Sequence, residues 1–291
     1  MIFFSGSFNK AVSLIAGSAN EIYMRESNFG DTLRLNGIEI AEDLDLDKIT
    51  LPNYLELAQL DVGGLIHLNG TSLNRDMEEN KKKCVIELFG IPVDKISFSF
   101  ENFELYTPDK PDISQFDDYN QIFENLIKKF TASGQLSSLE EVTKQHKRYK
   151  YLKDPTQNKY LGMFMNFVNR EWNDYGYSKV RIWLWTGGFF IFFWLINWLR
   201  FPHIYIHAYS TPSLANAVET RNYNTKAARR NFFNFRALDL SLYYTAIIFF
   251  GLKIESANFN FNNRRGVLYI AGQYIVGIIC LAYLANFIIV K

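Results

Sequence analysis

Cysteine and histidine are scarce in this chain of 291 residues, which contains two cysteines and four histidines. Cys84 and Cys280 lie far apart in the sequence and form no spaced pair, which argues against a disulfide framework and against a thiolate metal site. A strong charge of one sign is lacking as well. The formal net charge of +1 gives no electrostatic reason to expect a nucleic-acid partner.

Motifs of the common catalytic machineries are also lacking. The sequence contains no G-x-S-x-G segment, no phosphate-binding loop and no H-E-x-x-H segment. The candidate general bases are His67, His146, His203 and His207. We therefore predict that the protein is not an enzyme and that it uses no cofactor. The alternative is an activity whose site is assembled from scattered residues.

The residues that are abundant are divided unevenly along the chain. Aromatic residues make up 16% of the sequence and are concentrated in its last third, whereas most acidic residues lie in the first half. The two parts therefore suit different solvents, and the composition changes near residue 180. We expect at least two domains.

Pairs of large apolar residues recur between residues 22 and 73. Members of a pair are two residues apart, which places both side chains on one face of an extended segment. Successive pairs follow after five and six residues alternately, and no helix matches this spacing. The side chains predicted to point inward are Ile22, Met24, Ser27, Phe29, Leu33, Leu35, Ile38, Ile40, Leu44, Leu46, Ile49, Leu51, Leu55, Leu57, Leu60, Val62, Ile66, Leu68, Thr71 and Leu73.

This pattern predicts a short β-solenoid over residues 1–110, with four flat faces and a coil of roughly 22 residues. Turn-forming residues such as Asn36–Gly37 and Asn69–Gly70 lie between the pairs and supply the corners. The spacing resembles that of the pentapeptide-repeat family, with leucine or isoleucine in most places where that family prefers a small residue. An antiparallel β-sandwich is the alternative.

A helical neck is predicted for residues 111–178. Ser114 with Asp117 is typical of the start of a helix, which Gly134 would end, and Ser138 with Glu141 is typical of the start of a second helix. The second helix is rich in lysine and arginine. Its basic residues form either a solvated face or a surface attracted to phospholipid headgroups.

Two long uncharged runs predict membrane spans within a domain at 179–291. Residues 182–199 carry four tryptophans toward their ends, and residues 266–290 follow a pair of arginines. Buried core helices of a soluble protein are the alternative. Arg170, Lys179 and Arg181 precede the first span closely, so we expect the N-terminal domain to be cytoplasmic, with the spans in a bacterial inner membrane.

A third apolar run, residues 240–252, is too short to cross a membrane. Such a length suits a re-entrant segment, which is tolerated at membrane depth when it is buried in protein or lines water. We therefore predict a pore-helix-like segment between the two spans. A helix lying along the membrane interface is the alternative, because Tyr243 and Tyr244 suit that depth.

The order "WNDYGYSKVRIWLW", a span, "LSLYYTAIIFFGLKIE" and "NNRRGVLYIAGQYIVGIICLAYLANFII" is similar to that of bacterial two-span channel proteins related to potassium channels. The resemblance implies an outer helix, a pore helix, a filter and an inner helix, assembled as a homotetramer that conducts inorganic ions.

The filter departs from the potassium-channel pattern. Gly251 matches its first glycine, but Lys253 stands where the second glycine is required and Ile254 where an acid commonly follows. Potassium selectivity is therefore not supported. The residues predicted to form the filter-like segment are Phe250, Gly251, Leu252, Lys253, Ile254 and Glu255, and those at the pore mouth are Arg264 and Arg265. The alternative is that the charged residues anchor helix ends at the interface.

His203 and His207 are four residues apart, which on a helix would suit one metal ion. The surrounding alternation of residues favours an extended segment instead, and no carboxylate or cysteine nearby completes a ligand set. We keep the two histidines as weak metal candidates and predict no metal site.

Together, these patterns predict a multidomain α and β membrane protein: a short β-solenoid, a helical neck and a two-span module with a re-entrant segment. We expect a channel-like, oligomeric protein whose N-terminal domain regulates it or binds a protein or a ligand. The alternative is a non-conducting, membrane-anchored scaffold for protein interactions. The expected partners are the lipid bilayer, further copies of the chain and inorganic ions, and no nucleic acid.

Overall fold

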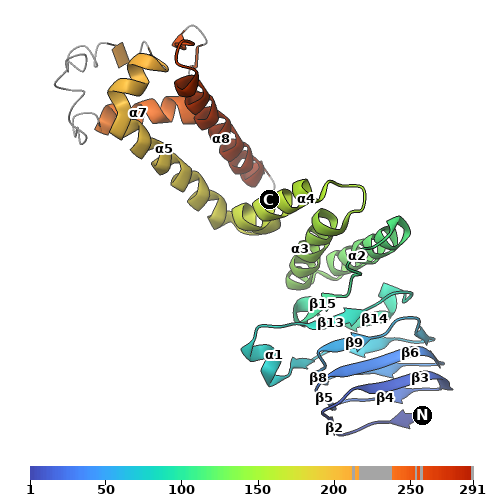
Figure 1. Cartoon of the computed structure of the whole chain (residues 1–291). Coiled ribbons are helices and arrows are strands. Elements are labelled where there is room, and N and C mark those ends of the chain that lie inside the picture. Colours follow the sequence, from blue (N-terminus) through green and yellow to red (C-terminus); the bar gives the residue numbers. More distant parts are fainter. Residues whose placement is uncertain (212–213, 216–237, 253, 256–257, 290–291) are drawn as a thin grey trace. The chain divides into compact units, whose positions relative to one another are not determined.

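The computed structural model describes residues 1–211, 214–215, 238–252, 254–255 and 258–289. The chain forms two compact units, Met1–Val168 and Asn169–Lys291 (Figure 1). The boundary at Val168 lies within the predicted neck at 111–178. The first unit therefore contains the N-terminal sheets together with most of the neck helices.

The first unit is built on three sheets whose strands all pair in parallel. One has the order β1 (Ile2–Phe3), β4 (Ile22–Tyr23), β7 (Leu44–Asp45), β11 (Ile66–Leu68) and β14 (Ile96–Phe98). Another has the order β10 (Asp61–Val62), β6 (Thr32–Ile40), β9 (Tyr54–Glu56), β13 (Cys84–Glu87) and β15 (Phe103–Leu105), with β3 (Val12–Ala19) also paired to β6. The third has the order β12 (Ser72–Leu73), β8 (Thr50–Leu51), β5 (Asn28–Phe29) and β2 (Ser7–Phe8).

The strand register explains the spacing of the apolar pairs. Ile22 pairs with Leu44, and Leu44 pairs with Ile66, so that β4, β7 and β11 lie 22 residues apart. Their side chains stack in one core. The predicted inward residues from Ile22 to Leu68 are all buried, whereas Thr71 and Leu73 are half-buried. The inward prediction is confirmed for this range.

The predicted fold class is wrong. In place of a short β-solenoid with four flat faces, the structure has three parallel sheets followed by helices. One reason lies in β6, which continues for nine residues through the Asn36–Gly37 corner, where Gly37 has a φ of +65°. Two of the expected faces therefore belong to a single sheet. The periodicity indicates which side chains point inward, but not where a hydrogen-bonded ladder ends.

Helices close one end of the sheets. The helical segments of the first unit are α1 (Arg75–Glu79), the short η1 (Val93–Lys95) and η2 (Phe100–Asn102), α2 (Ile113–Ser133), α3 (Leu136–Lys153) and α4, which begins at Lys159 and ends at Asn173. α2 buries Tyr119, Phe123, Leu126 and Phe130 in the same core as the strands. These large side chains cover apolar residues of the last strands that water would otherwise reach.

The helix boundaries differ slightly from those predicted. α2 starts with a capping box made by Asp112 and Gln115, not at Ser114, and ends as expected at Gly134, which has a φ of +69°. Ser138 does not cap α3, because its hydroxyl accepts a hydrogen bond from the Phe100 backbone N–H at 3.0 Å. The contact with Phe100 of η2 therefore gives Ser138 a role in tertiary packing, and not in capping α3.

The second unit contains three helices among its described residues, after the last turns of α4 and the short η3 (Asp174–Gly176). They are α5 (Lys179–His207), α7 (Leu238–Phe249) and α8 (Arg264–Ile289). Two of them, over Val180–Phe201 and Arg264–Ala285, are long and apolar enough to cross a membrane. This agrees with the predicted runs at 182–199 and 266–290, apart from Val290, which lies outside the described residues. α7 is apolar but too short to cross.

Candidate functional site

α7 packs against both of the longer helices, which also contact one another (Figure 1). It has 12 residues, about 18 Å of helix. Seven of them are buried: Leu240, Ser241, Tyr244, Thr245, Ile247, Ile248 and Phe249. Leu242 and Tyr243 form its exposed side. The region where α5, α7 and α8 meet is the candidate site, because the filter-like residues Phe250 and Ile254 pack there and it contains a group of buried polar side chains.

Asn197 of α5 joins the three helices through hydrogen bonds. Its Nδ2 donates to Thr245 Oγ1 of α7 at 2.8 Å and to Gln273 Oε1 of α8 at 3.2 Å. Its Oδ1 accepts a bond from the Tyr269 hydroxyl at 2.9 Å. Asn197, Thr245 and Gln273 are each fully buried. A buried amide whose hydrogen bonds are made in this way fixes the relative position of the elements it connects.

The network continues along α7. Gln273 Nε2 donates to the backbone oxygen of Thr245 at 3.2 Å, and the Thr245 hydroxyl donates to the backbone oxygen of Ser241 at 2.7 Å. The side chains therefore satisfy one another within a single copy of the chain. These residues are not among those predicted from the sequence. The signal was available, since isolated asparagine and glutamine residues in long apolar helices commonly bond between helices.

Gly251 ends α7 as a helix-capping glycine. Its φ is +69°, its N–H donates to the Ile248 oxygen, and the Leu252 N–H donates to the Ile247 oxygen. This pair of bonds is the Schellman arrangement, in which glycine is preferred because it enters the left-handed region without strain. A side chain here would also meet the Tyr274 ring, 3.0 Å from the position of an added Cβ. The capping role accounts for this glycine without any ion.

The last turn of α7 lies directly against α8. A Cβ added at Gly277 would lie 1.7 Å from the backbone oxygen of Phe249. Gly277 is about 20 Å along α8 from Arg264, at 1.5 Å per residue. In a candidate span that covers Arg264–Ala285, this position is close to the middle. The C-terminal end of α7, where helix carbonyls carry partial negative charge, therefore lies near the centre of the span.

The other filter-like residues take separate positions. The Phe250 ring stacks on Phe190 of α5, with centroids 5.5 Å apart, and the Leu252 side chain is exposed. Ile254 packs partly buried beside α5 and α7. The Glu255 N–H donates to the Tyr209 hydroxyl at 3.3 Å, and its carboxylate accepts a bond from Asn258 Nδ2 at 3.3 Å. Lys253 lies outside the described residues.

Arg264 and Arg265 occupy the first turn of α8, and both are exposed. Cations at a helix N-terminus lie at the positive end of the helix dipole, where they are mildly unfavourable. Their position therefore suits a contact with an anionic group or with water. Either the predicted pore mouth or an anchor at the membrane interface would supply such a contact.

His203 and His207 lie on the last turns of α5, so the predicted extended segment is wrong here. α5 has a kink at Arg200, whose φ is −120°, and the chain is helical again after it in spite of the local alternation of residue types. The two imidazole rings have centroids 5.0 Å apart. Among the residues that the structure describes, no group of three or more His, Cys, Asp or Glu side chains could hold a metal ion.

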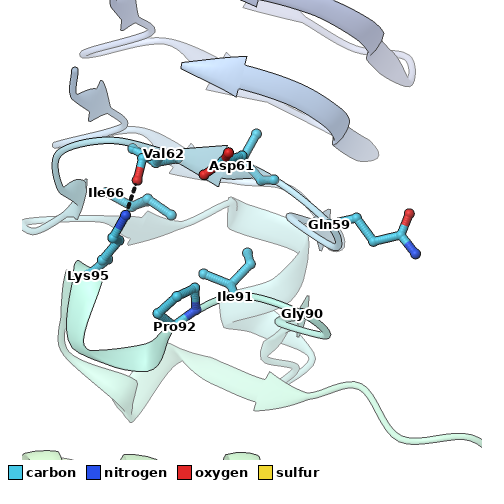
Figure 2. A pocket seen from close by; sticks show the side chains of 9 residues that line it. Gln59, Asp61, Val62, Ile66, Gly90, Ile91, Pro92 and Lys95 are labelled. Atoms are coloured by element: carbon cyan, nitrogen blue, oxygen red, sulfur yellow. Dashed lines mark hydrogen bonds between the residues drawn. The ribbon is translucent and has the colours of Figure 1, made fainter. Parts of the chain in front are cut away.

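The first unit offers a separate cavity of about 360 Å³ beside β10. Figure 2 shows Lys95 reaching back to the Val62 backbone oxygen, with Ile91 and Pro92 on the side of the cavity formed by the next segment of chain. The cavity lies where β10 ends its sheet, opposite the segment that leads into η1. Its size suits a small ligand or a side chain of a partner.

Comparison of the chain with protein-family models, with curated proteins and with solved structures finds no match.

Proposed function

We propose that the protein is an integral membrane protein whose second unit is one subunit of an oligomeric, channel-like assembly. One observation carries the proposal: the C-terminal end of the short helix α7 lies against the middle of α8, beside Gly277. The capping bonds at Gly251 and Leu252 end the helix there, so the chain continues as non-helical backbone at that depth, which lipid alone does not tolerate. Such a backbone needs either a second protein surface or a water-filled path.

The exposed residues beyond α7 support an oligomer. Leu252 is 56% exposed in a single copy, although it follows directly on Gly251 near the centre of the candidate span. Irregular backbone at this depth is stable when neighbouring protein covers it or when it lines a cavity. The two spans of a single copy are too few to surround such a path. Further copies around an axis would supply it, and the resemblance to two-span channels implies four.

The resemblance to two-span channels also suggests the role of the charged residues. Lys253, Glu255, Arg264 and Arg265 would determine which ions approach or pass. A potassium-type filter is not part of the proposal, because Lys253 replaces the glycine that such a filter needs and Gly251 has a capping role. The first unit would then serve as the regulatory or interaction domain.

A non-conducting, membrane-anchored interaction scaffold is the second candidate function. The network of Asn197, Thr245 and Gln273 favours it. These buried side chains form their hydrogen bonds within one copy of the chain, and none of them faces a water-filled path. In this case α5 and α8 hold the first unit at the membrane, and the cavity beside β10 belongs to a partner site.

Ion flux through reconstituted protein separates the two functions. Purified protein in liposomes should assemble as an oligomer and produce a measurable conductance. Lys253→Glu should shift the reversal potential in an anion gradient, because the ring of charge changes sign. Lys10→Glu, which makes the same charge change in the first unit, is the matched control and should leave the reversal potential unchanged. A monomeric protein without conductance would contradict the channel proposal and favour the scaffold.

The bacterial inner membrane with the first unit in the cytoplasm is the proposed location. Arg170, Lys179 and Arg181 close to the start of α5 support this orientation, since positive residues are retained on the cytoplasmic side. Green fluorescent protein fused to the N-terminus should fluoresce, and alkaline phosphatase fused there should be inactive. The reverse pattern would contradict the proposed orientation.

A further inference from the structure

α4 exposes its apolar side chains. Tyr160 is 81% exposed, Phe164 is 61% exposed and Phe167 is 56% exposed. The α4 apolar face consists of these residues together with Leu161, Met163 and Met165. At 100° per residue they cover an arc of about 200° around the helix. A continuous exposed apolar surface of this kind marks a site that contacts another protein, a ligand or a membrane.

The opposite side of α4 is polar and buried, which reverses the usual arrangement. An amphipathic helix of a soluble protein buries its apolar stripe and exposes its polar side. Here Asn166 is 9% exposed, and Gly162 lies so close to α3 that an added Cβ would be 2.1 Å from the Tyr151 oxygen. The helix therefore turns its apolar side away from the unit that holds it.

The C-terminal end of α4 contacts the first turns of α5, and both belong to the second unit. Arg181 Nη1 donates to the Arg170 backbone oxygen at 3.0 Å, and Trp185 Nε1 donates to the Glu171 backbone oxygen at 2.9 Å. The Trp172 ring packs on the Trp185 ring, with centroids 6.3 Å apart. Arg181 and Trp185 lie in the first turns of the candidate span Val180–Phe201. The end of α4 is therefore at the level where that span would enter the membrane.

We propose that the α4 apolar face lies in the lipid interface of the leaflet in which α5 begins. This inference rests on the proposed membrane location of α5 and α8. The exposed Lys159 lies at one edge of the apolar arc, where it suits a phosphate headgroup, and Tyr160 suits the interface. The arc is also wider than the narrow seam with which two helices pair, which favours lipid over a second copy as its occupant.

Spin labels on single cysteines test the proposal. In a full chain with Cys84→Ala and Cys280→Ala, we would place one cysteine at Phe164, or in a second variant at Phe167. Leu136, an apolar residue of α3 that is 75% exposed, is the matched control. Leu195, an exposed residue of α5, reports whether the span is in lipid. The proteins are reconstituted in phosphatidylcholine vesicles that contain phosphatidylglycerol.

Collisions of each label with oxygen and with a water-soluble nickel chelate then give its surroundings. The expected result is a several-fold higher oxygen-to-nickel ratio at Phe164 and Phe167 than at Leu136. If Leu195 reports lipid but both α4 labels report water, the inference is overturned and the membrane location stands. Labels on α4 that are shielded from both reagents would show that protein covers the face, which also overturns it. A water signal at Leu195 would remove the membrane location itself.

Discussion

The contact between α7 and α8 at Gly277 gives the sharpest prediction for the second unit. Gly277→Ala places a Cβ 1.7 Å from the Phe249 oxygen and 2.6 Å from the Phe249 carbonyl carbon. Real Cβ atoms essentially never approach within 3.0 Å, so α7 must move away from α8 by about 1.5 Å or the variant must unfold locally. Both contacts are with backbone, which no side-chain rotation relieves.

The expected cost follows from two opposing terms. Forcing an extra carbon into a packed contact costs typically about 1–3 kcal/mol, and a backbone contact lies at the upper end of this range. Replacing glycine by alanine inside a helix returns up to about 1 kcal/mol. We therefore expect Gly277→Ala to lower the unfolding free energy by about 2 kcal/mol, or several degrees in the apparent melting temperature.

Gly272→Ala is the matched control on the same helix. A Cβ at Gly272 meets nothing within 4 Å, so only the helix term applies and the variant should melt at the temperature of the parent or slightly higher. Melting in detergent, followed by intrinsic tryptophan fluorescence, measures both variants. Equal melting temperatures for the two variants would refute the packing of α7 against α8, and with it the argument from helix depth.

Two further predictions concern buried polar groups. Asn197→Leu leaves Thr245, Gln273 and Tyr269 without their shared partner, so it should lower the apparent stability of the second unit by about 2–3 kcal/mol. In the double variant Asn197→Leu/Gln273→Ala, the loss of stability should be smaller than the sum of the losses of the two single variants. Additive losses in the same melting assay would contradict a single network. In the first unit, burial lowers the pKa of His146 to about 4 from 6.5, and the imidazole bonds to Asn120. Because the unfolded chain binds the proton more readily, stability should be full above pH 6.5 and should fall as the pH drops toward 4, by about 2 kcal/mol after solvent screening. Urea unfolding of the parent and of His146→Gln across this range measures the difference, and parallel pH curves for the two would disprove the assignment to His146.

The sequence determined the side-chain pattern of the first unit. Pairs such as Leu33 and Leu35 point inward because residues two apart share one face of an extended segment, and this holds before any strand is paired. It also determined which helices could cross a membrane, since length and the absence of charge are local properties. Gly134 ended α2 as expected for the same reason, because a helix cap depends on neighbouring residues.

Tertiary structure decided how these elements combine. β6 pairs with β3 on both sides of Gly37, which merged two predicted faces into one sheet, and hydrogen bonds to strands far away in the sequence control such pairing. His203 and His207 became helical because the chain resumes a helix after the kink at Arg200. The network around Asn197, the contact at Gly277 and the outward apolar face of α4 each depend on which segments meet in space. A periodicity along one segment carries no information about its neighbours, and for this reason only the folded chain could show them.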